Sequence, residues 1–199
     1  RGPQVRLVHK PTEQVHLCLG TPALARTHPA RFALELLHVA LGANMSSRLF
    51  REVREKRGLV YEIGTHIKRY HDTGAFVISA GCDAGKVSET LRTVMVELSR
   101  ITRERMRPQE LRRAKEFYCG QLLMGLEDTA DHMLWMGEQA VTVGRIADPK
   151  ALASCIQRVE PHQVRQAARL LFRSERFFLA LVGPIPETKA SELAGLCVI

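Results

Sequence analysis

The sequence has 199 residues, of which 45% are hydrophobic and 25% are charged, and its formal net charge is +8. A chain of this length buries roughly 70% of its unfolded surface, so it can form a core without metals or disulfides. No apolar run approaches the ~20 residues that a membrane-spanning helix requires, and no membrane partner is expected. The composition therefore predicts one globular domain, residues 1–199.

The cysteines and the first residue bear on the cellular compartment. The five cysteines are widely spaced and include no C-x-x-C pair. Most have apolar neighbours, as buried free thiols do, and the odd number weakly favours a reducing compartment. Because the chain begins with Arg1 and not with methionine, we expect that the true N-terminus is missing. The localisation is therefore left open.

The first part of the chain combines predicted strands with one helix. Val5–His9 and Gln14–Leu19 alternate in polarity and predict a first pair of strands. Pro29–Leu41 has helical periodicity. An Asp-Thr-Gly turn then separates a strand from Leu59 to about Arg69 from an apolar strand at Ala75–Gly81. These last two strands are predicted to form a hairpin.

The rest of the chain is mostly helical. Helices are predicted at Lys86–Arg103, Pro108–Leu126, Thr129–Val143, Pro149–Ile156 and Pro161–Leu171. A final strand is predicted at Arg176–Val182, followed by a weakly specified tail with one helical turn. Strands with helices between and after them indicate an α+β fold, a mainly antiparallel sheet with helices packed on one face.

The segment Gly42–Gly64 combines a turn, a short amphipathic helix, a glycine stop and a strand. One face of this helix is predicted to be buried through Met45, Leu49, Phe50 and Val53. Gly58 stands where helices commonly end in a left-handed residue. Arg54 then falls in the last helical turn, and Tyr61 alternates with its neighbours in the following strand. The two residues are close enough in sequence to meet in space.

The same stretch, MSSRLFREVREKRGLVYEIG, is similar to the second-half signature of the pitrilysin/insulinase-type zinc peptidases, which include the mitochondrial processing peptidases. Later blocks resemble the same domain in order: DTGAFVISAGCDAGKV, PQELRRAKEFYCGQLLMGLED, GEQAVTVGRIADP, VEPHQVRQAARLLF and FFLALVGP. The resemblance extends from Val5 to about Pro184. It implies the C-terminal, non-catalytic domain, which is one repeat of the two-repeat peptidase architecture.

The chain lacks the zinc motif of these peptidases. In the family, the catalytic half carries H-x-x-E-H on a helix. None of the eight histidines begins that motif. Glu35 and His38 are three residues apart on a predicted helix, but no second histidine follows, and a dry helix flank explains them better. We therefore expect no metal, no cofactor and no peptidase activity in this chain. The resemblance implies that zinc resides in a partner catalytic half.

The resemblance also implies a site. Family members contribute an arginine and a tyrosine, seven residues apart, to the peptide-binding side of the catalytic chamber, and Arg54 and Tyr61 match this pair. A guanidinium can donate two hydrogen bonds to a substrate carbonyl, and a phenol can donate one to the developing oxyanion. Arg54 and Tyr61 are thus predicted to bind substrate, with Tyr61 stabilising the oxyanion in the complete enzyme. Alternatively, Arg54 pairs with Glu55 or a neighbouring helix, and Tyr61 fills a strand position.

Other features have plainer interpretations. The Gly42-Ala43-Asn44 loop is less glycine-rich than its counterpart in the family, and it either lines the chamber or forms a simple turn at a helix N-terminus. His66 and His71 are expected to be solvated, and Trp135 is expected to lie in the core.

Three functions remain open. The first is the substrate-binding half of a zinc metalloendopeptidase, with an H-x-x-E-H domain or subunit and a peptide substrate as its partners. The second is a proteolytically inactive structural protein, like the core subunits of the respiratory bc1 complex. The third, a nucleic-acid-binding domain, rests on the net charge and on the basic stretch Arg100–Lys115.

Two further expectations concern partners. Glutamates interrupt the Arg100–Lys115 stretch, so a solvated helix junction is preferred and no nucleic-acid partner is expected. The retention of both Arg54 and Tyr61 favours the peptidase half over the structural protein. In isolation, the domain is expected to cover its partner surface by forming a homodimer.

Overall fold

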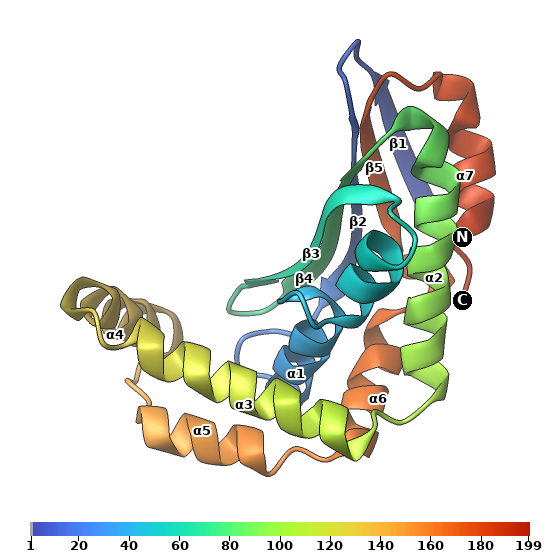
Figure 1. Ribbon diagram of the computed structural model, residues 1–199. Helices are drawn as coiled ribbons and strands as arrows, with labels where there is room; N and C mark the ends of the chain where they lie inside the picture. Colours follow the sequence, from blue (N-terminus) through green and yellow to red (C-terminus); the bar gives the residue numbers. More distant parts are fainter. Residues whose placement is uncertain (1) are drawn as a thin grey trace.

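The sheet of this molecule has five strands in the order β1-β5-β2-β4-β3 (Figure 1). The structure is a computed structural model that describes residues 2–199, and Arg1 lies outside this range. The strands are β1 Gln4–His9, β2 Val15–Ala23, β3 Val60–Arg69, β4 Gly74–Cys82 and β5 Phe178–Gly183. β1 and β5 run parallel, whereas the other neighbouring strands are antiparallel. The predicted mainly antiparallel α+β fold is confirmed.

The pairing of the strands differs from the prediction in one place. β3 and β4 form the predicted hairpin. β1 and β2 do not pair with each other, because β5, from the other end of the chain, lies between them. Alternating polarity identifies a strand without identifying its partner, so a pairing between the two ends of the chain leaves no local signal.

The helices lie close to their predicted positions. The part of the chain that the structure describes has α1 Arg31–Gly42, α2 Val87–Arg103, α3 Pro108–Gly125, α4 Thr129–Val143, α5 Pro149–Gln157, α6 Pro161–Leu171 and α7 Ala190–Leu196. Single 3₁₀ turns occur at Ala84–Lys86, Ser174–Arg176 and Glu187–Lys189, and a π-helical segment at Phe50–Glu55. Prolines stand in the first turn of α3, α5 and α6, where the missing amide hydrogen is not needed.

Helices α1, α2, α6 and α7 cover one face of the sheet and leave the middle of the other face open (Figure 1). The strand residues that point toward the helices are buried, among them Leu17, Leu19, Phe76, Ile78, Leu179 and Leu181. The strand register places mostly small residues together in the middle of the open face: Cys18, Gly20, Gly64, Ser79, Gly81 and Ala180. Larger exposed side chains of the same face, Phe178 and Val182, flank these small residues.

Helices α3, α4 and α5 extend from the base of this layer as an arm (Figure 1). α3 packs against the layer through its buried residues Leu111 and Ala114, whereas α4 contains no buried residue. The prediction that Trp135 lies in the core is therefore wrong, since this side chain is only half-buried on α4. An apolar cluster in the sequence does not reveal that its helix lies at the end of an arm.

The cysteines also differ from the prediction. Cys82 and Cys197 are buried, Cys119 and Cys155 are half-buried on the arm, and Cys18 is exposed on the open face of the sheet. All five thiols are free. The expectation that most are buried holds for two of them only, because apolar sequence neighbours do not fix which side of a strand or helix faces the core.

Candidate functional site

The junction between α1 and β3 carries the two predicted site residues. Leu49 and Val53 are fully buried here, as predicted, but the side chain of Met45 is 72% exposed. The prediction for Met45 is wrong because the helix begins only at Arg48. Before it, the side chain of Asn44 accepts a hydrogen bond from the Ser46 amide at 2.9 Å and so forms a local turn.

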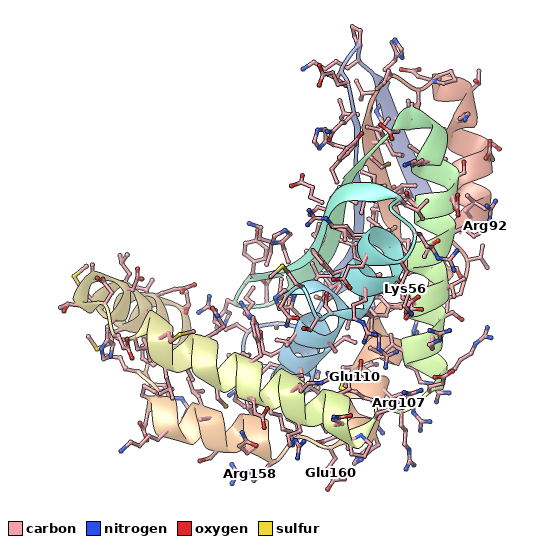
Figure 2. All side chains as sticks on the ribbon, viewed as in Figure 1. Lys56, Arg92, Arg107, Glu110, Arg158 and Glu160 are labelled. Atoms are coloured by element: carbon pink, nitrogen blue, oxygen red, sulfur yellow. The ribbon has the colours of Figure 1, made fainter. Side chains whose placement is uncertain are left out.

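Two ion-pair hydrogen bonds fix the start of this helix. The Nε and Nη2 atoms of Arg48 donate to the two carboxylate oxygens of Glu110 on α3 at 2.6 and 2.8 Å (Figure 2 labels Glu110). Both side chains are largely buried, so the pair is shielded from solvent. The arm and the junction are thereby held together.

The helix ends in a π-helical segment, Phe50–Glu55. The Lys56 amide donates to the Arg51 carbonyl at 2.9 Å, five residues back. Such segments are rare and frequently occur at functional sites. Gly58 follows with φ +57°, so the predicted left-handed stop is confirmed. The chain then turns directly into β3.

Tyr61 lies in a β-bulge. The pairing of β3 with β4 shifts between Val60 and Glu62, so Tyr61 is the extra residue of its strand. The predicted alternation therefore fails at this point: Tyr61 and Glu62 are both exposed, although they are neighbours. The Tyr61 side chain is 54% exposed. Bulges of this kind re-aim a side chain and are common beside active sites.

The Tyr61 hydroxyl donates a hydrogen bond to Oδ1 of Asp83 at 3.0 Å. This bond and the nearby carboxylate charge raise the pKa of Tyr61 above its ordinary value, because both favour the neutral phenol. Lys86 lies 3.7 Å from the other Asp83 oxygen and donates to the Gly58 carbonyl at 3.0 Å. The phenol is thus held as a hydrogen-bond donor at neutral pH.

Sequence reasoning did not assign a role to Asp83. Cys82, which precedes it, is paired with Val60, so Asp83 leaves β4 beside the bulge. One feature of the sequence could have identified Asp83. It is an acidic residue directly after the second strand of the predicted hairpin, and the first strand of that hairpin carries Tyr61. The hairpin was predicted, but its register was not.

Arg54 is exposed on the π-helical segment, with its guanidinium 4.9 Å from the centre of the Phe50 ring. Within residues 2–199, no ion pair joins Arg54 to Glu55, which was the structural alternative. Nor does a hydrogen bond join Arg54 to Tyr61 in this range. The structure places the two residues on either side of the Gly58 turn, each with its own partner, and their roles stay predictions.

Gly42 lets α1 approach β3 closely. A Cβ atom at this position would lie 2.8 Å from the Thr65 backbone nitrogen. Gly42 is the last residue of α1, and the loop that follows leads through the Asn44 turn into the helix that begins at Arg48, so it does form a turn before a helix N-terminus. His38, one turn earlier, has Nδ1 2.7 Å from the Thr65 hydroxyl, and burial lowers its pKa to about 4. The neighbouring Glu35 is also buried, as expected of a dry helix flank.

Two other predicted features can be checked. His66 and His71 are exposed, in agreement with the prediction of solvated histidines. The basic stretch Arg100–Lys115 spans the junction between α2 and α3, as predicted. Within it, Arg100 forms an ion pair with Glu97 at 2.8 Å.

The fold of this domain is shared by solved structures. Over 93% of the chain it superposes on the peptidase M16 inactive domain from Pseudomonas fluorescens, with a TM-score of 0.83, 22% identity and coverage of 44% of that chain. It also superposes over 99% of its length on a chain of Complex III2 from Candida albicans, with a TM-score of 0.84, 14% identity and coverage of 50% of that chain. At these identities the likeness concerns the fold.

The family described as peptidase M16 inactive domain matches residues 1–118, which is more than half of the sequence. The chain therefore belongs to this family, and the predicted relationship to zinc peptidases is confirmed.

Curated relatives of this chain also support its relationship to zinc proteases. An uncharacterized zinc protease of Streptomyces coelicolor is 37% identical over 190 residues, which cover 96% of this chain and 41% of the relative. The uncharacterized zinc protease YmxG of Bacillus subtilis is 34% identical over 175 residues, which cover 88% of this chain and 42% of the relative. The chain thus spans about two fifths of the length of these proteins.

The described part of the chain does not contain a set of side chains that could bind the zinc ion of such proteases. Among residues 2–199, no group of three or more His, Cys, Asp or Glu side chains is placed to hold a metal ion. The side chains present therefore do not fit a zinc ion. In the same range, no helix combines the length and the apolar character needed to cross a bilayer.

Proposed function

We propose that residues 1–199 form one domain that serves as the substrate-binding, non-catalytic half of a zinc-dependent metalloendopeptidase. Membership of the inactive-domain family and the zinc protease relatives support a non-catalytic half. The observation that carries the substrate-binding part is Tyr61, whose hydroxyl is exposed on a bulge and held as a donor by Asp83. Its catalytic partner is an H-x-x-E-H half, in the same polypeptide or in another subunit, and the zinc resides there.

In this proposal Tyr61 and Arg54 act on the peptide directly. The Tyr61 hydroxyl exchanges Asp83 for the peptide carbonyl oxygen and donates to the negative charge that develops on it during hydrolysis. The raised pKa of Tyr61 keeps the donated proton on the phenol at neutral pH. The Arg54 guanidinium, which lies against the Phe50 ring in the free chain, donates to a second carbonyl and positions the peptide.

A second candidate is a structural, proteolytically inactive subunit of the same fold. One observation favours it: Tyr61 and Arg54 already have partners within the chain, Asp83 and Phe50, and need no ligand to satisfy them. The likeness to a chain of Complex III2 concerns the fold and does not decide between the two candidates.

Reconstitution tests the proposal. The chain alone should hold zinc below one equivalent after dialysis, should not cleave unfolded peptides, and should elute as a homodimer that covers its partner surface. Addition of the matching H-x-x-E-H half should disperse the homodimer and produce zinc-dependent cleavage of unfolded peptides. A stable one-to-one complex that remains inert on every peptide tried would favour the structural candidate.

A further inference from the structure

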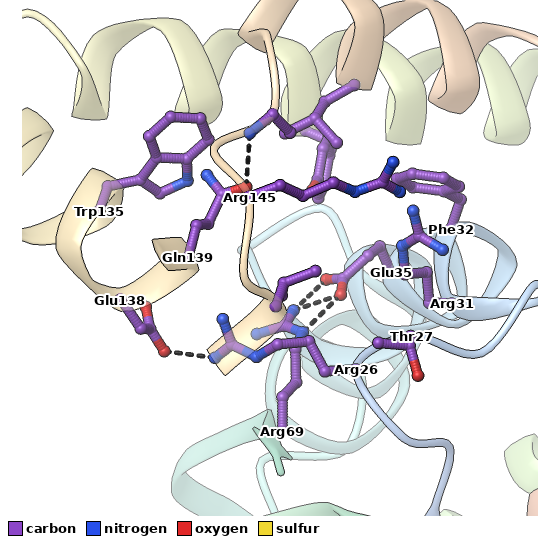
Figure 3. Close-up of a pocket in the computed structure, with 14 residues that line it drawn as sticks. Arg26, Thr27, Arg31, Phe32, Glu35, Arg69, Trp135, Glu138, Gln139 and Arg145 are labelled. Atoms are coloured by element: carbon purple, nitrogen blue, oxygen red, sulfur yellow. Dashed lines mark hydrogen bonds and ion pairs between the residues drawn. The ribbon is translucent and has the colours of Figure 1, made fainter. Parts of the chain in front are cut away.

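A pocket of about 310 Å³ lies between α1, α4 and the end of β3 (Figure 3). Four arginines from separate segments of the chain line it: Arg26, Arg31, Arg69 and Arg145. Two glutamates, Glu35 and Glu138, face them. Because a guanidinium remains charged at every accessible pH, the pocket carries an excess of positive charge.

Both glutamates are already engaged. Glu35 is buried and accepts hydrogen bonds from Nε of Arg69, at 2.7 Å, and from its Nη2. Glu138 accepts a hydrogen bond from Nη2 of Arg26. In the chain from residue 2 to 199, neither Arg31 nor Arg145 has a carboxylate partner. Two positive charges in the pocket are thus left without counter-charges.

These two arginines point to the same part of the pocket. The Arg31 guanidinium lies 4.2 Å from the centre of the Phe32 ring. Figure 3 shows the Arg145 side chain extending across the pocket toward Phe32 and Arg31. Arg145 is exposed and Arg31 is half-buried, so solvent screens part of the repulsion between these like charges, and an anion between them would reduce the rest.

The unpartnered buried atoms of the pocket are donors. Nε of Arg26 and Nε2 of Gln139 are buried without a hydrogen-bond acceptor. The other polar atom of the Gln139 amide, Oε1, is used, since it accepts from the Ala147 amide at 3.1 Å. Tyr118 also lines the pocket, and burial raises its pKa to about 12, so its hydroxyl stays protonated and can donate. A ligand that satisfies these groups must be rich in acceptors.

We propose that this pocket binds a small oxyanion, a phosphate or a carboxylate group, between Arg31, Arg145 and Arg26. The planar fork of a guanidinium donates a pair of hydrogen bonds to two oxygens of a planar carboxylate or of a tetrahedral phosphate. Phe32 and Trp135 provide apolar walls for the body of the molecule that carries the anion. The site is built by α1, α4 and the segments beside them, and it does not depend on the role of Tyr61.

Trp135 reports on binding because it is the one tryptophan of the sequence and lines the pocket. Inorganic phosphate should change its fluorescence saturably when it replaces chloride at constant ionic strength, and calorimetry should give the same affinity. Arg31→Gln and Arg145→Gln should each weaken binding about tenfold or more, because each removes a charged donor. Arg92→Gln, on the exposed side of α2 (Figure 2), is the matched control and should bind as the unsubstituted chain does.

The result that overturns the proposal is phosphate binding that is undetectable by both methods, or that is equally strong in the Arg31→Gln, Arg145→Gln and Arg92→Gln chains. Circular dichroism of each variant establishes that it is folded. A repeat of the titration on the complex with the catalytic half separates the two sources of the anion. If phosphate still binds, the ligand is a small free anion; if binding is blocked only in the complex, a carboxylate of the catalytic half occupies the pocket.

Discussion

At the scale of single residues, the bond between Tyr61 and Asp83 defines the chemistry of the candidate site. A phenol that donates to a carboxylate is a weaker acid than a free phenol, so its proton is retained for donation to another acceptor. The bulge exposes this hydroxyl, and the end of β4 supplies its partner.

The contribution of Asp83 can be measured through the pKa of Tyr61. Asp83→Ala removes the hydrogen bond and the charge, so the pKa of Tyr61 should fall toward the value of an ordinary phenol. Asp83→Asn keeps an acceptor but removes the charge, and should produce a smaller decrease. The ultraviolet absorbance of the phenolate, taken as the difference between each chain and its Tyr61→Phe counterpart, reports this titration. Identical titrations in all three chains would show that Asp83 does not control the phenol.

Arg54 is expected to contribute to peptide binding and little to turnover. Arg54→Lys retains the charge but loses the planar pair of donors, so KM of the assembled enzyme should rise roughly tenfold while kcat changes little. Arg57→Lys, an exposed arginine three residues further along the same turn, is the matched control. An Arg54→Lys enzyme with the same KM as the Arg57→Lys control would remove Arg54 from the peptide-binding site.

At the scale of elements, Gly58 allows the π-helical segment to turn directly into β3. Its φ of +57° is one that side-chain-bearing residues adopt at a cost, although no neighbouring atom would clash with an added Cβ. Gly58→Ala should therefore lower the free energy of unfolding by about 1 kcal/mol in urea titrations. Gly120→Ala, inside α3 and equally free of neighbours, should raise it by roughly 0.5–1 kcal/mol. Equal effects of the two substitutions would exclude backbone strain as the cause.

Local chemistry made most elements predictable from the sequence. Prolines and side-chain caps marked the starts of helices, and Gly58 and Gly144 marked their ends with positive φ. The bulge at Tyr61 could not be predicted from the sequence, because the position of an inserted residue depends on the register of β3 against β4. The partner Asp83 was missed for the same reason. The insertion of β5 between β1 and β2 likewise depends on contacts between the two ends of the chain.

At the scale of the whole molecule, the half-buried His38 links stability to pH. In the folded chain its pKa is lowered to about 4, first by burial and then by the positive charges of Arg69 and His66. Between pH 6.5 and 4 the unfolded chain binds a proton that the folded chain does not, so stability falls as the pH falls. Each pH unit in this window should cost about 1.4 kcal/mol, and the whole window roughly 3 kcal/mol.

Urea titrations across this pH window check the prediction. His38→Gln cannot be protonated, so the loss of unfolding free energy between pH 6.5 and 4 should be smaller in this variant than in the unsubstituted chain. Carboxylates that titrate in the same range contribute equally to both chains and cancel in the comparison. Parallel stability curves for the two chains would mean that His38 does not account for the pH dependence.

The open face of the sheet suits a domain that works opposite a partner. Small residues lie in its centre, Tyr61 lies in β3, the last strand of the sheet order, and Arg54 lies on the segment that leads into this strand. The matched relatives are more than twice as long as this chain, so they contain sequence that could supply the opposing half. We therefore propose that this domain takes part in peptide cleavage through Tyr61 once it is assembled with a catalytic half.

The turnover number of the assembled enzyme with Tyr61→Phe tests this role of Tyr61. The substitution removes one exposed hydroxyl, so folding, assembly and zinc content should be unchanged. If the hydroxyl donates to the developing oxyanion, kcat should fall by roughly 10²-fold or more, as on loss of an oxyanion donor. An unchanged kcat, in a folded and fully assembled enzyme, would contradict the account and leave Tyr61 with a structural role.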